Sequence, residues 1–211
     1  MTARTAFGGR HPRPPSAAQG DDPVTLRTTA AHAPATAAVL DYAEAMSTLA
    51  SGVVLVTCRL DGRPWGVTIS AFSSVSADPP TVLVSLGTEG IAARAIAATR
   101  RFGVSVLAAQ QRPLARLGSA PGAAKFLEPF VEAACDTGAS PVVAGSLAHL
   151  DCDVVEAVAV ADHTVFFGRV RTARAARAGT PLLYHRREYR TLGGPARAHP
   201  PIARSLGCLS N

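Results

Sequence analysis

Side chains with hydroxyl groups are concentrated in one short stretch of the chain, just before a pair of prolines. The hydroxyls belong to Thr68, Ser70, Ser73, Ser74 and Ser76, and the stretch ends at Asp78-Pro79-Pro80. Because proline has no amide hydrogen, we expect the strand to run into a loop here, with backbone N–H groups free to bind a ligand. Hydroxyls and free amides suit the polar edge of a planar heterocyclic ligand. The alternative is a polar strand at the edge of a sheet that faces water and binds nothing.

Other common catalytic signatures are missing from the sequence. No G-x-G-x-x-G motif opens a helix after a predicted strand, which argues against a Rossmann dinucleotide site. Residues 118–125 resemble a phosphate-binding loop only loosely, since they lack Gly-Lys-Ser/Thr. No H-E-x-x-H or G-x-S-x-G motif occurs. The four cysteines show no C-x-x-C spacing, so we expect neither a metal site nor a disulfide framework, and we expect buried, inert thiols at Cys58 and Cys152.

Composition predicts one globular domain with polar ends. The chain has 211 residues and is 47% apolar, which is ample for a core. No apolar block follows the arginines of the N-terminus and no run is long enough to span a bilayer, so we expect a cytoplasmic protein. Four of the six net positive charges lie in residues 1–36 and 194–211, which favours solvated tails over a nucleic-acid surface. A cationic tail that docks on an acidic partner remains an alternative.

The distribution of apolar residues predicts a mainly β domain with inserted helices. We expect a disordered N-terminal arm at 1–36, a folded domain at 37–193 and a C-terminal tail at 194–211. Asp61-Gly62 predicts a hairpin turn. Predicted helices cover 37–50, 91–99 and 111–117. Predicted strands cover 53–58, 63–72, 81–86, 102–107, 147–158, 163–173, 181–186 and 188–192. Regular helical crossovers are too few for a parallel α/β sheet, so a β-barrel is expected.

From about residue 40 to 193 the sequence resembles the FMN-binding split-barrel flavin reductases, the reductase components of two-component flavin-dependent monooxygenases. Each matching block is weak alone, but together they occur in the family's order and spacing. The blocks are Ala50–Thr57, Gly66–Pro80, Phe102–Leu107, Lys125–Phe126, Leu150–Cys152, Asp162–Gly168 and Pro181–His185. The resemblance implies a split β-barrel of Greek-key type that assembles as a homodimer.

The same resemblance implies a flavin site. The segment from Thr68 to Ser74 would hold the flavin ring and ribityl chain, through Thr68, Ser70, Ala71, Phe72, Ser73 and Ser74. Ser85, Leu86 and Thr88 would line the other side and lead towards the phosphate, where a helix beginning near Gly90 would direct its N-terminus. Lys125 would pair with the phosphate, the alternative being an ordinary surface lysine.

The resemblance also implies a nicotinamide side of the site. His163 would lie near flavin and nicotinamide as the catalytic residue, positioning the reactants rather than transferring protons. The alternative is that His163 is the first residue of a strand and forms a hydrogen bond with a loop carbonyl. Tyr184, His185 and Tyr189 would close over the nicotinamide, or else pack in the core or the dimer interface. Hydride transfer itself would be the chemistry of the cofactors.

Two positions depart from the family pattern. Gly90-Ile91-Ala92 replaces the usual Ser-x-Thr near the phosphate, and Ser105 replaces a common Asn. The first departure leaves FMN and FAD open as alternatives, and the sequence does not distinguish NADH from NADPH. The expected function is an NAD(P)H:flavin oxidoreductase that supplies reduced flavin to a partner monooxygenase. The alternatives are a flavin carrier or partner subunit without turnover, an enzyme that uses bound flavin on an organic substrate, and a nucleic-acid binder that uses the basic tails.

Overall fold

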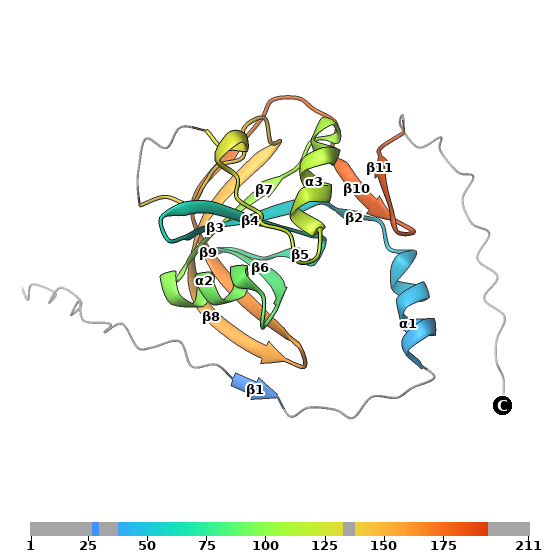
Figure 1. Ribbon diagram of the computed structural model, residues 1–211, viewed down its shortest axis with the longest axis horizontal. Helices are drawn as coiled ribbons and strands as arrows, with labels where there is room; N and C mark the ends of the chain where they lie inside the picture. Colours follow the sequence, from blue (N-terminus) through green and yellow to red (C-terminus); the bar gives the residue numbers. More distant parts are fainter. Residues whose placement is uncertain (1–26, 30–37, 133–137, 194–211) are drawn as a thin grey trace, which may run out of the picture.

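The computed structural model describes residues 27–29, 38–132 and 138–193. Seven strands form one antiparallel sheet in the order β4-β3-β7-β8-β9-β6-β5 (Figure 1). They are β3 (Val54–Leu60), β4 (Arg63–Ile69), β5 (Phe72–Ala77), β6 (Pro80–Gly87), β7 (Arg101–Val106), β8 (Ala148–Val160) and β9 (His163–Ala175). The prediction of a mainly β fold is thereby confirmed. Of the arm predicted at 1–36, only β1 (Arg27–Thr29) is described, paired in parallel with β8; the tail at 194–211 lies outside the described residues.

A second, smaller sheet has the order β11-β10-β2 and lies beside the first. Its strands are β2 (Ser51–Gly52), β10 (Leu182–His185) and β11 (Glu188–Thr191). The turn between β10 and β11 consists of Arg186 and Arg187, both in the left-handed region with φ of 48° and 62°. Glycine or asparagine is usual at such positions, so a pair of arginines is uncommon there.

The two edge strands of the large sheet are neighbours in the chain. β4 ends at Ile69 and β5 begins at Phe72, so only Ser70 and Ala71 separate the two edges of the sheet. The edges must therefore come together at this joint, although no ladder joins β4 to β5 among the described residues. The joint is where the hydroxyl-rich stretch begins.

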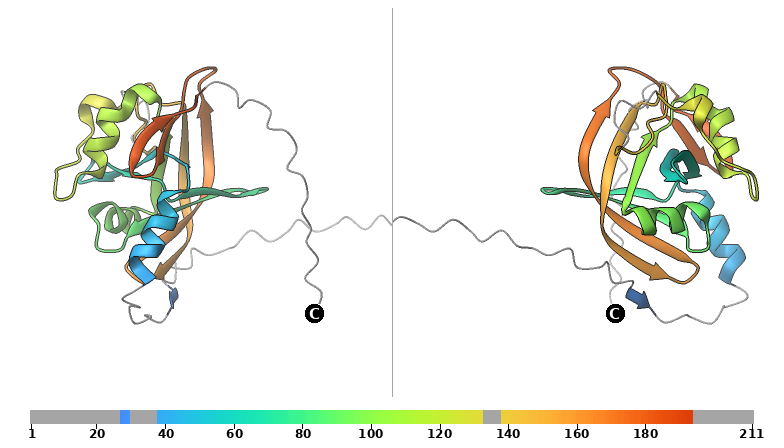
Figure 2. Two further views of the ribbon diagram at one scale, coloured as in Figure 1. Left: turned by 90° about the vertical axis from the view of Figure 1, so that its right-hand side faces the viewer. Right: turned by 60° about the vertical axis from the view of Figure 1, so that its left-hand side comes forward.

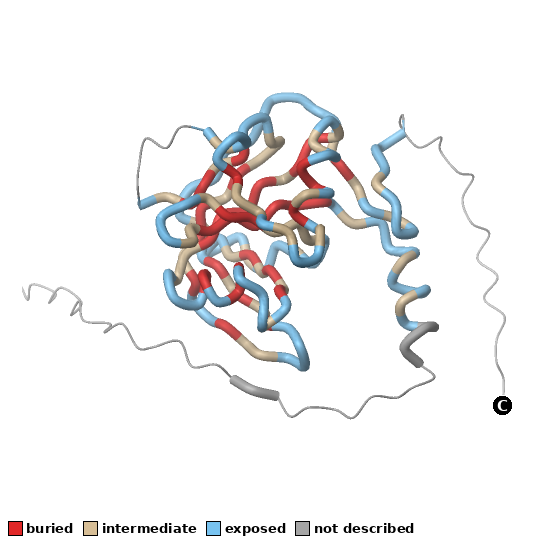
Figure 3. The backbone as a smooth tube through the Cα atoms, viewed as in Figure 1, coloured by how far each residue is buried: buried red, intermediate tan, exposed pale blue. Residues whose placement is uncertain are grey.

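The core lies on both faces of β3, which explains why this strand is a continuous apolar run. Val54 and Val56 pack in one buried cluster with Ile96, whereas Leu55 belongs to a second cluster with Leu114. The buried segments of the chain lie together in the interior of the domain (Figure 3). Each such side chain contributes about 1.5–3 kcal/mol when it is fully buried. β3 is thus held on both faces, and it pairs with β4, the edge strand whose end forms the wall of the candidate site.

Three helices flank the sheets. They are α1 (Ala38–Ser47), α2 (Ile91–Thr99) and α3 (Arg112–Ser119), with short 3-10 turns at Ala109–Gln111 and Glu128–Phe130. α3 buries Leu114, Ala115 and Gly118, and a Cβ at Gly118 would collide with the Thr68 hydroxyl. Glycine is therefore required for α3 to lie this close to β4. None of the described helices is long and apolar enough to cross a membrane.

The predicted strand at 63–72 ends at Ile69, and the prediction that an irregular loop follows it is wrong for most of the segment before the prolines. Residues Phe72–Ala77 form β5, whose ladder with β6 has one bulge between Ser74 and Ser76. Serine alternating with apolar residues is compatible with an edge strand, and β6 provides backbone partners for it. The hairpin formed by β5 and β6 projects from the body of the domain (Figure 2). β1 and β2 were not predicted, whereas the three α-helices and the remaining strands match their predicted ranges to within a few residues at each end.

Candidate active site

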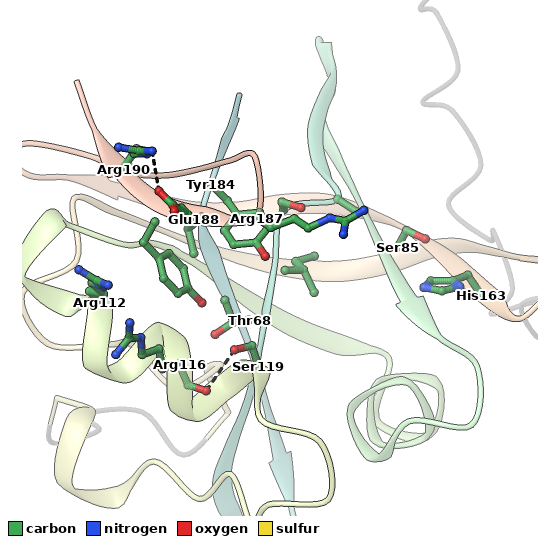
Figure 4. A pocket seen from close by; sticks show the side chains of 15 residues that line it. Thr68, Ser85, Arg112, Arg116, Ser119, His163, Tyr184, Arg187, Glu188 and Arg190 are labelled. Atoms are coloured by element: carbon green, nitrogen blue, oxygen red, sulfur yellow. Dashed lines mark hydrogen bonds and ion pairs between the residues drawn. The ribbon is translucent and has the colours of Figure 1, made fainter. Parts of the chain in front are cut away.

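A cavity of about 900 Å³ opens beside the joint between β4 and β5 (Figure 4). One wall consists of Thr68, Ile69, Ser70 and Ala71, together with Ser85 of β6. The facing walls come from α3 and from the hairpin of β10 and β11. The cavity therefore has an apolar surface at Ile69, bordered by hydroxyls and by backbone that leaves the sheet.

Polar groups at this wall lack partners within the protein. The β3–β4 ladder ends at the pair Val54–Ile69, and no described residue accepts a hydrogen bond from the backbone N–H of Ser70 or Ala71. The Thr68 hydroxyl is buried and has no partner among the described residues. The Thr68 hydroxyl is covered by Gly118 of α3, whereas Ser70 and Ala71 are exposed, so their N–H groups can donate to a ligand with acceptors on its edge. The wall fits the polar edge of a flavin ring.

A second cavity of about 380 Å³ adjoins the first and shares Ile69, Ser85 and His163 with it. Its lining includes Lys125 and the first turn of α2, which begins after Gly90. Partial burial lowers the pKa of Lys125. The N-terminus of a helix and a lysine are both favourable neighbours for an anion, so this cavity fits the phosphate end of a flavin nucleotide.

His163 lies where the two cavities meet. It is the first residue of β9, and its side chain is half exposed. Its Nδ1 lies 2.8 Å from Oδ1 of Asp162, and this hydrogen bond, with the charge of His163, lowers the pKa of Asp162. The partner is thus a carboxylate rather than the loop carbonyl considered as an alternative. The carboxylate holds the ring by one nitrogen and leaves Nε2 for a ligand.

Most of the residues predicted for the site lie together. Those that line one or both cavities are Thr68, Ser70, Ala71, Ser85, Leu86, Lys125, His163, Tyr184 and Tyr189. The two tyrosines contact each other edge to face, with ring centroids 5.4 Å apart. They come from neighbouring strands, where Tyr184 pairs with Tyr189 in the ladder.

Five predicted residues line neither cavity. Phe72 packs against the core, while Ser73 and Ser74 are exposed further along β5. The Thr88 hydroxyl lies 3.0 Å from that of Thr164 and so is already hydrogen-bonded. His185 follows Tyr184 on β10, and successive side chains of a strand point to opposite faces of the sheet.

Several polar residues of the first cavity, most of them charged, were not predicted from the sequence. Arg112, Arg116 and Ser119 reach it from α3, and Arg187, Glu188 and Arg190 reach it from the hairpin of β10 and β11. The first three follow the spacing i, i+4, i+7 and so lie along one face of the helix. That spacing was available in the sequence, but nothing in it indicated that α3 packs beside β4.

Comparison with known proteins supports a flavin site. The profile of the family described as "Flavin reductase like domain" matches residues 46–193. The reductase component of a 4-nitrophenol 4-monooxygenase/4-nitrocatechol 2-monooxygenase of Rhodococcus opacus is 36% identical over 146 residues, which cover 69% of this chain and 77% of the relative.

Solved structures give the same result. The flavin reductase component of a bacterial two-component tryptophan halogenase matches with a TM-score of 0.67 and 32% identity, covering 72% of this chain and 97% of that one. An NADH:FAD oxidoreductase of Streptomyces globisporus, solved with NAD and FAD fragments, matches with a TM-score of 0.67 and 29% identity, covering 75% and 94%. The chain therefore belongs to the family of flavin reductase like domains.

Proposed function

We propose that this protein is an NADH-dependent flavin reductase that supplies reduced FMN or FAD to a separate monooxygenase. The observation that carries the proposal is the cavity at the joint between β4 and β5, where the backbone N–H groups of Ser70 and Ala71 have no partner among the described residues. Family membership supports it, as do relatives named NADH-dependent flavin and FAD reductases.

In this proposal Ile69, Ser70 and Ala71 would hold the flavin ring, with Thr68 in the same wall. Lys125 and the first turn of α2, in the second cavity beyond Ser85, would hold its phosphate end. A bound flavin would supply the acceptor for the hydride of NADH, and solvent would supply the accompanying proton. The protein contributes binding, orientation and exclusion of water from between the two rings.

The nicotinamide side of the proposed site is formed by His163, Tyr184 and Tyr189. The hydrogen bond between Nδ1 of His163 and the Asp162 carboxylate restrains the imidazole, so that Nε2 would offer a fixed polar contact to the flavin. Tyr184 and Tyr189, packed edge to face, present aromatic side chains to the same cavity as Ile69. Reactants held between these side chains and the wall at Ile69 would lose little orientation before the transfer step.

We also propose that the large sheet forms a barrel that is closed at one end only. We assign a split β-barrel of Greek-key type at 37–193, with the arm at 1–36 and the tail at 194–211 outside it. Support comes from the order of the large sheet, whose two edge strands are joined by two residues yet share no ladder. A sheet with that connection curls towards closure at one end and stays open at the other.

A homodimer is the assembly that these surfaces favour. Tyr42 and Met46 on α1 and Leu49 just after it are 67%, 47% and 56% exposed, and Val75 on the projecting β5 is 48% exposed. Apolar groups on two protruding elements suggest a surface that a second copy covers.

We place the protein in the cytoplasm, where NADH and an oxygenase partner are both available.

Steady-state NADH oxidation tests the proposal. The purified protein is assayed with FMN and with FAD in turn, and with NADH against NADPH. We expect saturable turnover with at least one flavin and a preference for NADH. Absence of NADH oxidation with either flavin would refute reductase activity.

One observation favours a flavin carrier as a second candidate. The α2 N-terminus is capped by Gly90 without a side-chain hydrogen bond, so the phosphate end offers no hydroxyl from this segment. A carrier would bind flavin and show no turnover in the assay above. An enzyme that uses flavin on an organic substrate would instead retain its flavin through gel filtration.

A further inference from the structure

We propose that Arg112 and Arg116 bind the diphosphate of the nicotinamide dinucleotide and so determine its affinity. The inference rests on the proposed function and adds residues that the sequence analysis did not consider. Both arginines belong to α3 and line the first cavity. In Figure 4 they lie at one end of this cavity, whereas Ser85 and His163 lie at the other.

The face of α3 that carries these arginines is separate from its packing face. Leu114, Ala115 and Gly118 are buried, whereas Arg112 and Arg116 are exposed to the cavity. Neither guanidinium forms an ion pair with any residue that the structure describes. Like charges four residues apart destabilise a helix slightly, and an anion bound between the two guanidinium groups would offset this repulsion.

A third arginine strengthens the positive charge from the opposite wall. Arg187 reaches the same cavity from the β10–β11 turn, where it has a φ of 62°. Its contact with Glu44 is long, at 3.8 Å, and both side chains are largely exposed, so this contact neutralises little of its charge. Arg190, in contrast, lies 2.5 Å from Glu188 and is neutralised. A left-handed arginine that points into a cavity is typical of a strained functional position.

The diphosphate of the hydride donor fits this end of the cavity better than the flavin phosphate does. The flavin phosphate already has a separate place with Lys125 in the second cavity, beyond Ser85 and His163. The tyrosines proposed for the nicotinamide line the same cavity as the arginines. Arginine forms paired hydrogen bonds with phosphate oxygens, and two arginines one helical turn apart match two adjacent phosphates. FAD also contains a diphosphate, and the experiment separates the two sources.

The experiment compares the wild type with Arg112→Ala, Arg116→Ala and the double variant, using FMN as the acceptor and, in a second series, FAD. We expect the KM for NADH to rise about tenfold for each single variant and more for the double, with kcat little changed. Reduced nicotinamide riboside has no phosphate, so its KM stays at the wild-type value. The KM for FMN also stays unchanged. Arg177→Ala removes an equal charge from an exposed position outside both cavities and serves as the control.

Each other outcome overturns the proposal in a distinct way. An unchanged KM for NADH in the double variant rules out the diphosphate contact. If the KM for reduced nicotinamide riboside rises as much as the KM for NADH, the arginines maintain the shape of the site and do not bind phosphate. A rise in the KM for FAD without a rise for NADH assigns them to the flavin diphosphate. If the wild type shows no turnover, the proposed function fails, and calorimetry with ADP-ribose still tests the arginines, because the proposal requires binding that the double variant loses.

Discussion

The position of His163 favours a role in binding the reactants over a role in stabilising the fold. It lines both cavities, is half exposed, and is fixed by Asp162 through a 2.8 Å contact. A side chain in this place can orient the nicotinamide against the flavin without taking part in proton transfer. Because little of it is buried, its removal should not destabilise the fold.

We predict that His163→Ala lowers kcat/KM for NADH about tenfold, which corresponds to about 1.4 kcal/mol of transition-state stabilisation. Anaerobic stopped-flow reduction of the flavin measures the effect directly. His185→Ala is the matched control, since His185 lines neither cavity. A His163→Ala variant with wild-type rate and KM would show that the imidazole does not position the reactants.

At the scale of elements, the sequence predicts strands and helices well and predicts contacts between them poorly. The apolar run of β3 and the Asp61-Gly62 turn identify their elements without further information, and both residues of that turn have positive φ. β5 was missed because its serines resemble a loop until β6 is known to pair with it.

The site was predicted in the same uneven way. The wall at Thr68–Ala71 and His163 could be found because the family resemblance includes them. The arginines of α3 could not, because their role depends on Gly118 allowing the helix to approach β4, which is a contact between segments about 50 residues apart. Local spacing gives the face of a helix but not the surface that this face meets.

The exposed apolar face of α1 leads to a prediction about assembly. We expect Tyr42→Asp combined with Met46→Asp to convert a dimer into a monomer, because the charges would have to be buried in the interface. Size-exclusion chromatography with light scattering measures the mass. Tyr42→Phe with Met46→Leu keeps the face apolar and should leave the dimer intact. A dimer that survives the two aspartates would place the interface elsewhere.

At the scale of the whole molecule, a buried polar network connects β7 and β8 to the segment that follows residue 138. His149 Nδ1 lies 2.9 Å from the Ser105 hydroxyl, and its Nε2 lies 3.3 Å from that of Ser140. Burial lowers the pKa of His149 to about 4; the charge of Asp151 opposes this and that of Arg174 adds to it. The folded protein therefore contains the neutral imidazole.

This shift predicts a loss of stability in mild acid. The pKa of His149 is about 4 in the folded state and 6.5 in the unfolded state, so the unfolded state binds the proton first. Stability is complete above pH 6.5 and falls as the pH drops towards 4, by about 3 kcal/mol in total. Urea unfolding at pH 7.5 and pH 4.5 measures most of this difference.

The titration of Asp151, the carboxylate near His149, does not interfere with that test. Burial acts to raise the pKa of Asp151, but hydrogen bonds from Ser140 and the charge of Arg101 outweigh it, so the pKa lies below 3.8. The stability that Asp151 contributes is therefore lost only below the pH range of the measurement. A His149→Gln variant should show a flatter dependence between the two pH values. An equally steep dependence in that variant would assign the acid sensitivity to other groups.

The central claim is that the joint between β4 and β5 holds a flavin ring, and a flavin titration tests it most directly. Quenching of flavin fluorescence is followed for the wild type and for Ala71→Trp, which fills the cavity wall with a bulky side chain. We predict saturable binding of one FMN or FAD per chain, weakened at least tenfold in the variant, or about 1.4 kcal/mol. No saturation by either flavin, or equal affinity in Ala71→Trp, would contradict the assignment.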